Sequence, residues 1–283
     1  MPRTHCSRFR AAFTLLEVAM VIIIIALLVG TITVSQSMKH NSEIQKVLST
    51  AQGFASSIQQ FKAKYNALPG DMIDATRVWG EADPDCNVIA TANARSGVGV
   101  ATCNGDGDGF IRDGNGGTLT ESFRVWEHLA LAGFIGGQYT GIQAVAGAAN
   151  FASTVIAEDD PLRNAPGSPI KNAGFYIGSY GNITDTAHAS NFVADYNNAM
   201  IFGTAAAGNI PNGPVFKPTD AFMVDQKLDD GSPAYGQIVT YKNVANCVVN
   251  VTNTAIQTAA YGLTFTNAAC MLFFLNKFQA KPE

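Results

Sequence analysis

The feature that most constrains this chain is an apolar run near its N-terminus. Residues 18–34 read Val-Ala-Met-Val-Ile-Ile-Ile-Ile-Ala-Leu-Leu-Val-Gly-Thr-Ile-Thr-Val and carry no charge. Together with residues 13–17 they would form a helix of about 33 Å, which matches the roughly 30 Å hydrocarbon core of a bilayer. The flank before the run holds Arg3, Arg8 and Arg10 and no acid. Such a flank is expected to stay in the cytoplasm, so the rest of the chain should lie on the other side of a membrane.

Three interpretations of this segment are open: a cleaved secretory signal peptide, a permanent single-pass anchor, or a helix processed at its start. A secretory signal has an apolar region of about 7–15 residues, which is shorter than this run. The small pair Ala11-Ala12 also precedes the run instead of following it. Glu17 favours the third interpretation, because a carboxylate in an apolar helix is usually functional and needs a partner. Cleavage after Ala12 would create such a partner, the free α-amino group of Phe13.

The segment Arg10-Ala-Ala-Phe-Thr-Leu-Leu-Glu-Val-Ala-Met-Val resembles the class III signal sequence of type IV pilins and type II secretion pseudopilins. The resemblance implies that a prepilin peptidase cleaves between Ala12 and Phe13 and that Phe13 is then N-methylated. It also implies that Glu17 helps to dock each subunit into a growing filament. The family usually has Gly before the cleavage site, where this chain has Ala12.

The same resemblance implies a location and a set of partners. The chain would cross the bacterial inner membrane once, with its head outside the cytoplasm, and then enter a pilus or pseudopilus or reach the cell surface. Its partners would be the prepilin peptidase, other copies of itself, related pilin subunits and an inner-membrane assembly platform.

Residues 37–66 predict an amphipathic helical stem that continues the apolar helix. Apolar side chains recur at steps of three and four residues, which places them on one helix face. They are Ile44, Val47, Leu48, Ala51, Phe54, Ala55, Ile58, Phe61 and Tyr65. The helix should end before Pro69-Gly70, giving a length of about 75–80 Å. We interpret the stripe as core packing against the domain that follows.

The remaining residues, 67–283, predict a globular α+β head. Short apolar runs between turn residues predict strands at 174–180, 199–202, 237–241, 247–251 and 271–275. Short helices are expected at 121–132, closed by Gly133, and over part of 72–80. We therefore expect the long N-terminal helix to pack on a large antiparallel β-sheet head with one or two extra short helices. The resemblance to type IV pilins implies that this fold is pilin-like. The expected division is a cleaved basic leader at 1–12, a transmembrane and polymerisation helix at 13–36, the stem at 37–66 and the head.

The cysteines predict disulfide bonds. Cleavage would remove Cys6 and leave an even number in an exported chain, which is typical of disulfide bonding. Four cysteines allow three connectivities, and closeness in sequence favours Cys86–Cys103 and Cys247–Cys270. A zinc site is the alternative, but the chain has no C-x-x-C motif and its histidines are dispersed.

A glycine-rich acidic loop, Asn104-Gly-Asp-Gly-Asp-Gly-Phe-Ile-Arg-Asp-Gly-Asn, has the first half of an EF-hand-like pattern. Alternating short oxygen side chains can wrap a hard cation, and a backbone carbonyl supplies a further ligand. Asn115 occupies the position where an EF-hand has a bidentate Glu, so Asp113 or Glu121 would have to supply the missing oxygens. The loop therefore predicts a Ca²⁺ site, with a solvated turn held by Asx hydrogen bonds as the alternative. The predicted ligands are Asn104, Asp106, Asp108, Phe110, Asp113 and Asn115.

No pattern points to an enzyme or to nucleic acid. Charged residues make up only 14% of the chain and the formal net charge is −4, which argues against nucleic acid as the main partner. The motifs H-E-x-x-H and G-x-S-x-G are absent, and so is a dinucleotide-binding glycine loop. We interpret His128 as a packed or surface side chain. We interpret Asp225, Asp229 and Asp230 as turn and surface charges, with a metal site as the alternative. The expected function is that of a structural filament subunit without enzymatic activity, with a minor or tip adhesin-like binding module as the alternative.

Overall fold

The structure is a computed structural model. The described residues are 14–80, 102–112, 121–139, 141, 165–170, 172–185, 189–204, 211, 213–242, 244–251 and 258–275, without the side chains of 30–37. The chain divides into two compact units, Met1–Gln45 and Lys46–Glu283.

One helix, α1 (Leu15–Tyr65), extends through 51 residues and confirms the prediction of a continuous helix. No proline interrupts it, and it ends where predicted. Asn66 follows with a φ of 52°, the left-handed conformation that often terminates a helix. Pro69 and Gly70 then lie in a turn.

None of the described helices is long and apolar enough to cross a membrane. The predicted membrane segment at 13–36 extends beyond this description, because Phe13 and the side chains of 30–36 lie outside it.

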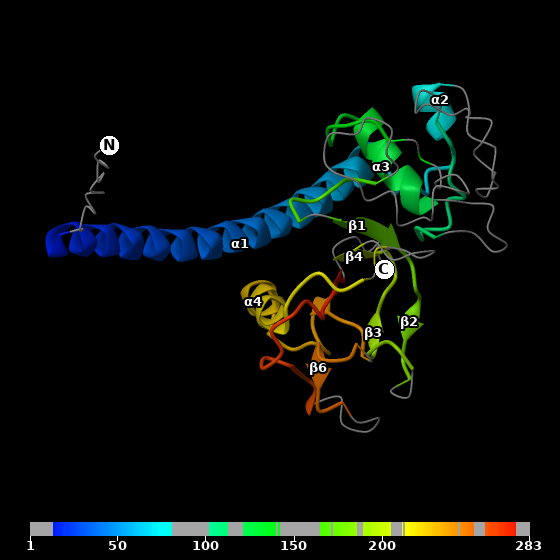
Figure 1. The fold of residues 1–283 in the computed structure, drawn as a ribbon. Coiled ribbons are helices and arrows are strands. Elements are labelled where there is room, and N and C mark those ends of the chain that lie inside the picture. The colour runs from blue at the N-terminus through cyan, green and yellow to red at the C-terminus, as the bar shows by residue number, and fades with distance from the viewer. Residues whose placement is uncertain are drawn as a thin grey trace, which may run out of the picture. The chain divides into compact units, whose positions relative to one another are not determined.

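The main sheet has four antiparallel strands in the order β1-β4-β8-β5, of which β1 and β4 are labelled in Figure 1. Two smaller sheets pair β2 with β3 and β6 with β7. The strands are β1 (Ala173–Gly178), β2 (Asn182–Ile183), β3 (Ala194–Asp195), β4 (Ala199–Thr204), β5 (Ile238–Val239), β6 (Val248–Val249), β7 (Ala260–Tyr261) and β8 (Leu272–Phe274). The mixed α+β class and the five predicted strands β1, β4, β5, β6 and β8 are therefore confirmed. The strands β2, β3 and β7, which have two residues each, were not predicted.

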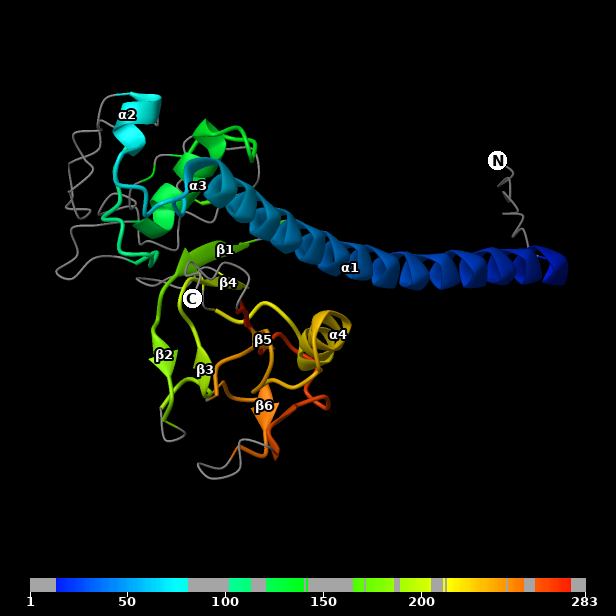
Figure 2. The same ribbon diagram turned by 180° about the vertical axis from the view of Figure 1, so that it is seen from behind.

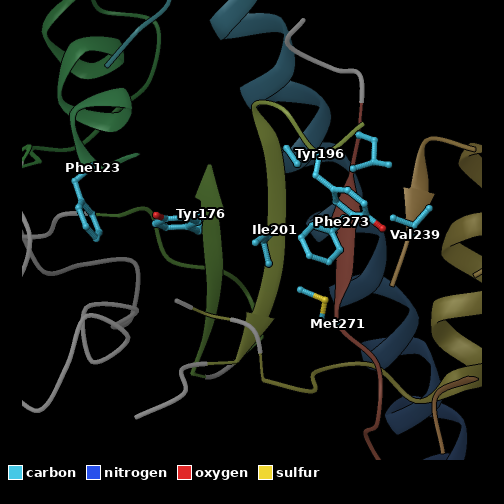
Figure 3. Close-up of a cluster of buried hydrophobic side chains, with 9 residues drawn as sticks. Phe123, Tyr176, Tyr196, Ile201, Val239, Met271 and Phe273 are labelled. Atoms are coloured by element: carbon cyan, nitrogen blue, oxygen red, sulfur yellow. The ribbon is translucent and has the colours of Figure 1, made fainter. Parts of the chain in front are cut away.

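One face of the main sheet carries a row of registered side chains, one from each strand. Tyr176 pairs with Ile201, Ile201 with Phe273, and Phe273 with Val239. Figure 3 shows this row, with Phe123 of the helix α3 (Glu121–Leu131) beside Tyr176. All of these side chains are buried, so this face forms a hydrophobic core.

The opposite face of the sheet meets the C-terminal part of α1. Strand side chains alternate between faces, so Phe175 and its partner Phe202 point away from Tyr176 and Ile201. The ring of Phe54 in α1 lies 5.2 Å from the ring of Phe175. Five further α1 side chains are almost fully buried: Val47, Leu48, Ala51, Ile58 and Phe61. The interpretation of the apolar stripe as core packing is thus confirmed, and each large side chain contributes about 1.5–3 kcal/mol by burial.

Three helices accompany α1 in the described parts of the chain, where one or two were predicted. They are α2 (Ala75–Trp79), α3 (Glu121–Leu131) and α4 (Pro218–Leu228). The helix α4, which lies beside β5, was not predicted (Figure 2). The sequence does hold its signals: a proline at the first position, Asp220 in the first turn and Lys227 in the last turn.

A disulfide joins Cys247 to Cys270, with 5.1 Å between the two Cα atoms, as predicted. Cys103 is also disulfide-bonded, to a cysteine outside the described residues. Since Cys86 lies outside them as well, the predicted pair Cys86–Cys103 stays a prediction.

Candidate functional site

The first turn of α1 is capped by Thr14 and Glu17. The backbone N–H of Thr14 donates a hydrogen bond of 2.9 Å to Oε2 of Glu17, and the Thr14 hydroxyl donates one of 3.0 Å to the same oxygen. The backbone N–H of Glu17 in turn reaches Oγ1 of Thr14 at 3.3 Å. This reciprocal arrangement is a capping box, which satisfies backbone donors that a helix start leaves without partners. The predicted cleavage and methylation residues, Ala12 and Phe13, lie outside the described residues.

The part of α1 that follows the cap exposes its apolar side chains. Glu17 is the only charged residue between Leu15 and Val29. The large apolar side chains of this segment are between 46% and 91% exposed, on all sides of the helix. They are Leu15, Leu16, Val18, Met20, Val21, Ile22, Ile23, Ile24, Ile25, Leu27, Leu28 and Val29. A continuous exposed apolar surface of this kind usually marks a segment that contacts lipid or another protein.

A second candidate site lies in the unit Lys46–Glu283, where three segments bring acidic side chains together. Asp71 follows α1, Asp106 lies in the glycine-rich loop, and Glu121 is the first residue of α3. Each of these side chains has a carboxylate oxygen within 4.8 Å of the others. We refer to Asp71, Asp106 and Glu121 as the carboxylate cluster.

Glycines allow the backbones around the carboxylate cluster to approach closely. The N–H of Gly105 donates a hydrogen bond of 2.8 Å to the carbonyl of Met72. A Cβ atom at Gly105 would overlap the backbone of Asp71. Gly70 has a φ of +89°, and a Cβ atom there would lie 2.6 Å from the carbonyl oxygen of Glu121. Only glycine fits at these two positions without a shift of the backbone.

Backbone amides hold the two buried carboxylates in place. Oε1 of Glu121 accepts a hydrogen bond of 2.9 Å from the N–H of Asp106, and Oε2 accepts one of 3.1 Å from the N–H of Arg112. Oδ2 of Asp71 accepts a hydrogen bond of 3.0 Å from the N–H of Gly109. Oδ1 of Asp71 is buried and has no hydrogen-bond partner among the described residues.

Burial changes the acidity of both carboxyl groups. It raises the pKa of Asp71 to about 6 and the pKa of Glu121 to about 7, because desolvation disfavours the charged form. The amide hydrogen bonds oppose this rise, while the neighbouring carboxylates add to it. The site therefore brings together carboxyl groups whose ionised form is unfavourable without a compensating partner.

The predicted cation ligands of the loop are placed differently from one another. Asp106 belongs to the carboxylate cluster, whereas the side chain of Asn104 is hydrogen-bonded to Thr76 of α2. Asp108 forms an ion pair with Arg112 and accepts a hydrogen bond of 2.8 Å from the N–H of Phe110. Asp113 and Asn115 lie outside the described residues.

Glu121, named from the sequence as a possible additional ligand, lies in the cluster, whereas Asp71 was not predicted to be part of it. The sequence feature that could have drawn attention to Asp71 is its position directly after the Pro69-Gly70 turn. That feature does not reveal which loop the acid will meet, because more than thirty residues separate Asp71 from Asp106.

His128 links the turn before Asp71 to Cys103. It is fully buried, accepts a hydrogen bond of 2.9 Å from the N–H of Gly70 at Nδ1, and contacts the carbonyl of Cys103 at 2.8 Å through Nε2. This pairing matches a neutral ring with the proton on Nε2. Burial lowers the pKa of His128 to about 4. The interpretation of His128 as a packed side chain is confirmed.

A second group of acids, Asp225, Asp229 and Asp230, is used in local hydrogen bonding. Asp225 accepts hydrogen bonds from the Tyr261 hydroxyl at 2.8 Å and from the N–H of Gly231 at 3.1 Å. Asp229 accepts hydrogen bonds from the backbone of 237 and 238, and Asp230 from the backbone of 232. These contacts organise the turn after α4. Asp225 is fully buried, so its interpretation as a surface charge is wrong. The three acids also have carboxylate oxygens within 4.8 Å of one another, and the metal-site alternative stays a prediction.

In comparisons with known proteins, no family model, curated protein or solved structure matches the chain with significant similarity.

Proposed function

We propose that this chain is a structural subunit of a type IV pilus-like or type II secretion pseudopilus filament. In this proposal a prepilin peptidase removes residues 1–12 and the new N-terminus at Phe13 is methylated. The chain is held in the inner membrane by its N-terminal helix before it enters the filament. It then polymerises through that helix.

The observation that carries the proposal is the exposed apolar surface of α1 between Leu15 and Val29. Removing apolar surface from water is favourable by about 25 cal/mol per Å², so a helix that is apolar on all sides is unfavourable in water. Lipid would cover this surface first. Neighbouring copies of the same helix would cover it in the filament.

In the proposed assembly, Glu17 fixes the register of neighbouring N-terminal helices. Apolar packing is non-directional, and long apolar helices can slide past one another at little cost. A lone acid that must meet the Phe13 amine of a neighbouring copy restricts the possible alignments. Misaligned packing would leave a charge unpaired in an apolar environment, which is strongly unfavourable.

The test is filament assembly of a Glu17→Ala variant in a host that processes the wild-type chain. Glu43→Ala is the matched control. Glu43 is another acid of α1, and it forms an i,i+4 ion pair with Lys39 within its own helix. We expect normal membrane insertion of both variants and strongly reduced recovery of Glu17→Ala in sheared filament fractions. Wild-type recovery of Glu17→Ala would refute the docking role.

A second proposal is that the chain is a minor or tip subunit with an adhesin-like head. The size of the unit Lys46–Glu283 favours it, because polymerisation alone does not require so large a head. Copy number in sheared filaments distinguishes the two proposals. A minor subunit would be present at a small fraction of the major subunit, whereas a major subunit would make up most of the filament mass.

A further inference from the structure

We propose that Asp71, Asp106 and Glu121 together bind one Ca²⁺ ion and thereby join three segments of the head. The site goes beyond the proposed filament function and does not depend on it.

The geometry of the carboxylate cluster matches the size of a calcium coordination sphere. Calcium binds oxygen ligands at about 2.3–2.6 Å, so two oxygens on one ion lie at most about 5 Å apart. Oxygens of all three side chains lie within 4.8 Å of one another. One ion can therefore contact all three carboxylates.

The Oδ1 atom of Asp71 provides independent support. Asp71 is only 4% exposed, and this oxygen has no hydrogen-bond partner in the described parts of the chain. A buried carboxylate oxygen without a donor is costly. Since Asp71 is a member of the carboxylate cluster, a cation between the three side chains would compensate this carboxylate.

The charges around the cluster also favour a cation. Among the described residues, no basic side chain forms an ion pair with any of the three acids. Arg112 pairs with Asp108, and Arg124 donates to the backbone carbonyl of Asn104. In the part of the chain that the structure describes, the buried carboxylates are compensated by backbone amides alone. These hydrogen bonds fix the orientation of the carboxylates, as such bonds do for the ligands of many metal sites. A carboxylate oxygen that accepts one hydrogen bond still has a lone pair for a metal.

The ligand chemistry selects the type of ion. The cluster contains carboxylates and neither His nor Cys, which suits hard cations and not zinc. Mg²⁺ requires a nearly ideal octahedron at about 2.0–2.1 Å and keeps several waters. Three carboxylates from separate segments, two of them buried, fit the more variable coordination of Ca²⁺.

The test uses the full-length chain, purified in detergent and treated with a chelator. Calorimetric titration measures Ca²⁺ binding, and thermal unfolding measures the stabilisation that binding produces. Asp106→Asn is the informative variant, because Asp106 is exposed and Asn can still accept the hydrogen bond that Oδ1 receives from the N–H of Asp108. Asp195→Asn is the matched control. Asp195 lies outside both acidic groups, and its Oδ1 likewise accepts a hydrogen bond from the N–H two residues on, that of Asn197.

We expect the wild type to bind one Ca²⁺ and to unfold about 5 °C higher in excess Ca²⁺ than in chelator. Asp106→Asn should weaken binding about tenfold or more, since affinity follows ligand charge. Asp195→Asn should bind Ca²⁺ as tightly as the wild type and keep the Ca²⁺-induced increase in unfolding temperature. Absence of binding by the wild type, or wild-type affinity in Asp106→Asn, would overturn the proposal. An equal increase with the same concentration of Mg²⁺ would overturn the assignment to Ca²⁺.

Discussion

Thr14 and Glu17 cap the N-terminus of α1 with reciprocal hydrogen bonds, in which each residue accepts a bond from the backbone of the other. Glu17 therefore has a role within its own chain besides the proposed pairing with a neighbouring subunit. The cap requires a hydrogen-bond acceptor at residue 17, whereas the pairing requires a negative charge. Substitutions can separate these two requirements.

Glu17→Gln should retain the cap and lose assembly. A glutamine oxygen can accept the bond from the N–H of Thr14, because capping boxes use Glu or Gln at this position. The uncharged amide cannot pair with the amine of Phe13. We expect unchanged helix content by circular dichroism and greatly reduced recovery in sheared filaments. Normal assembly of this variant would show that the cap, and not the charge, is what assembly needs.

Thr14→Val is the complementary change. Valine removes the hydroxyl that caps the helix and leaves the charge of Glu17 in place. We expect a local loss of about 1 kcal/mol, seen as faster amide hydrogen exchange in the first turn of α1, with filaments still formed. Failure of Thr14→Val to assemble while it remains in the membrane would contradict the charge-based account.

Gly105→Ala should destabilise the head by roughly 1–3 kcal/mol, because the added methyl group would overlap the backbone of Asp71. Gly53→Ala is the control. Gly53 lies within α1, and a methyl group added there would meet no atom within 4 Å, so alanine should stabilise that helix by roughly 0.5–1 kcal/mol. Urea unfolding of both variants gives the two free energies. Equal effects at the two positions would contradict the close approach at Gly105.

His128 should make the head less stable in acid. Its pKa is lowered to about 4 in the folded chain, against about 6.5 in the unfolded chain, so only the unfolded chain binds a proton between these pH values. The contribution of the neutral ring is fully present above about pH 6.5 and is lost as the pH falls toward 4. At pH 4.5 the loss amounts to about 2–3 kcal/mol.

Comparison of the wild type with His128→Gln isolates this effect, because the other titrating groups are common to both proteins. The variant should be less stable than the wild type at pH 7.5, and this difference in unfolding free energy should shrink or reverse at pH 4.5. A difference that stays constant over this range would contradict a buried neutral ring.

Removal of the Cys247–Cys270 disulfide should lower the free energy of unfolding by about 3 kcal/mol. The bond spans 23 residues and connects the region of β6 to the residue two positions before β8, so it restricts the unfolded chain. Cys247→Ala/Cys270→Ala removes the bond without leaving a free thiol. Urea unfolding measures the change, and a double variant as stable as the wild type would contradict a stabilising role for this bond.

Local patterns in the sequence predict much of the fold. The spacing of apolar residues predicted the second half of α1, and the Pro69-Gly70 turn predicted its end near residue 66. Short apolar runs predicted β1, β4, β5, β6 and β8. The strands that were missed have two residues each and are defined by their pairing, β2 with β3 and β7 with β6. Helix α4 was missed although Pro218 and its charged turns mark it, since its apolar face is narrow.

The candidate site shows what local sequence patterns cannot predict. The glycine-rich loop predicted an acidic cation site and named Asp106, but spacing within a loop cannot identify a ligand from another segment. Asp71 joins the carboxylate cluster only because Gly105 and Gly70 let the backbones come together. In the same region the Asn104 side chain is hydrogen-bonded to Thr76, a contact that no local pattern in the sequence indicates.

The central claim is that the chain is cut after Ala12 and assembles through the helix that then begins at Phe13. Intact mass and N-terminal sequencing of the protein from membranes and from sheared filaments test this most directly. We predict one mature species that starts with N-methylated Phe13 in both fractions. A chain that starts at Met1, or one cut downstream of residue 36, would contradict the claim.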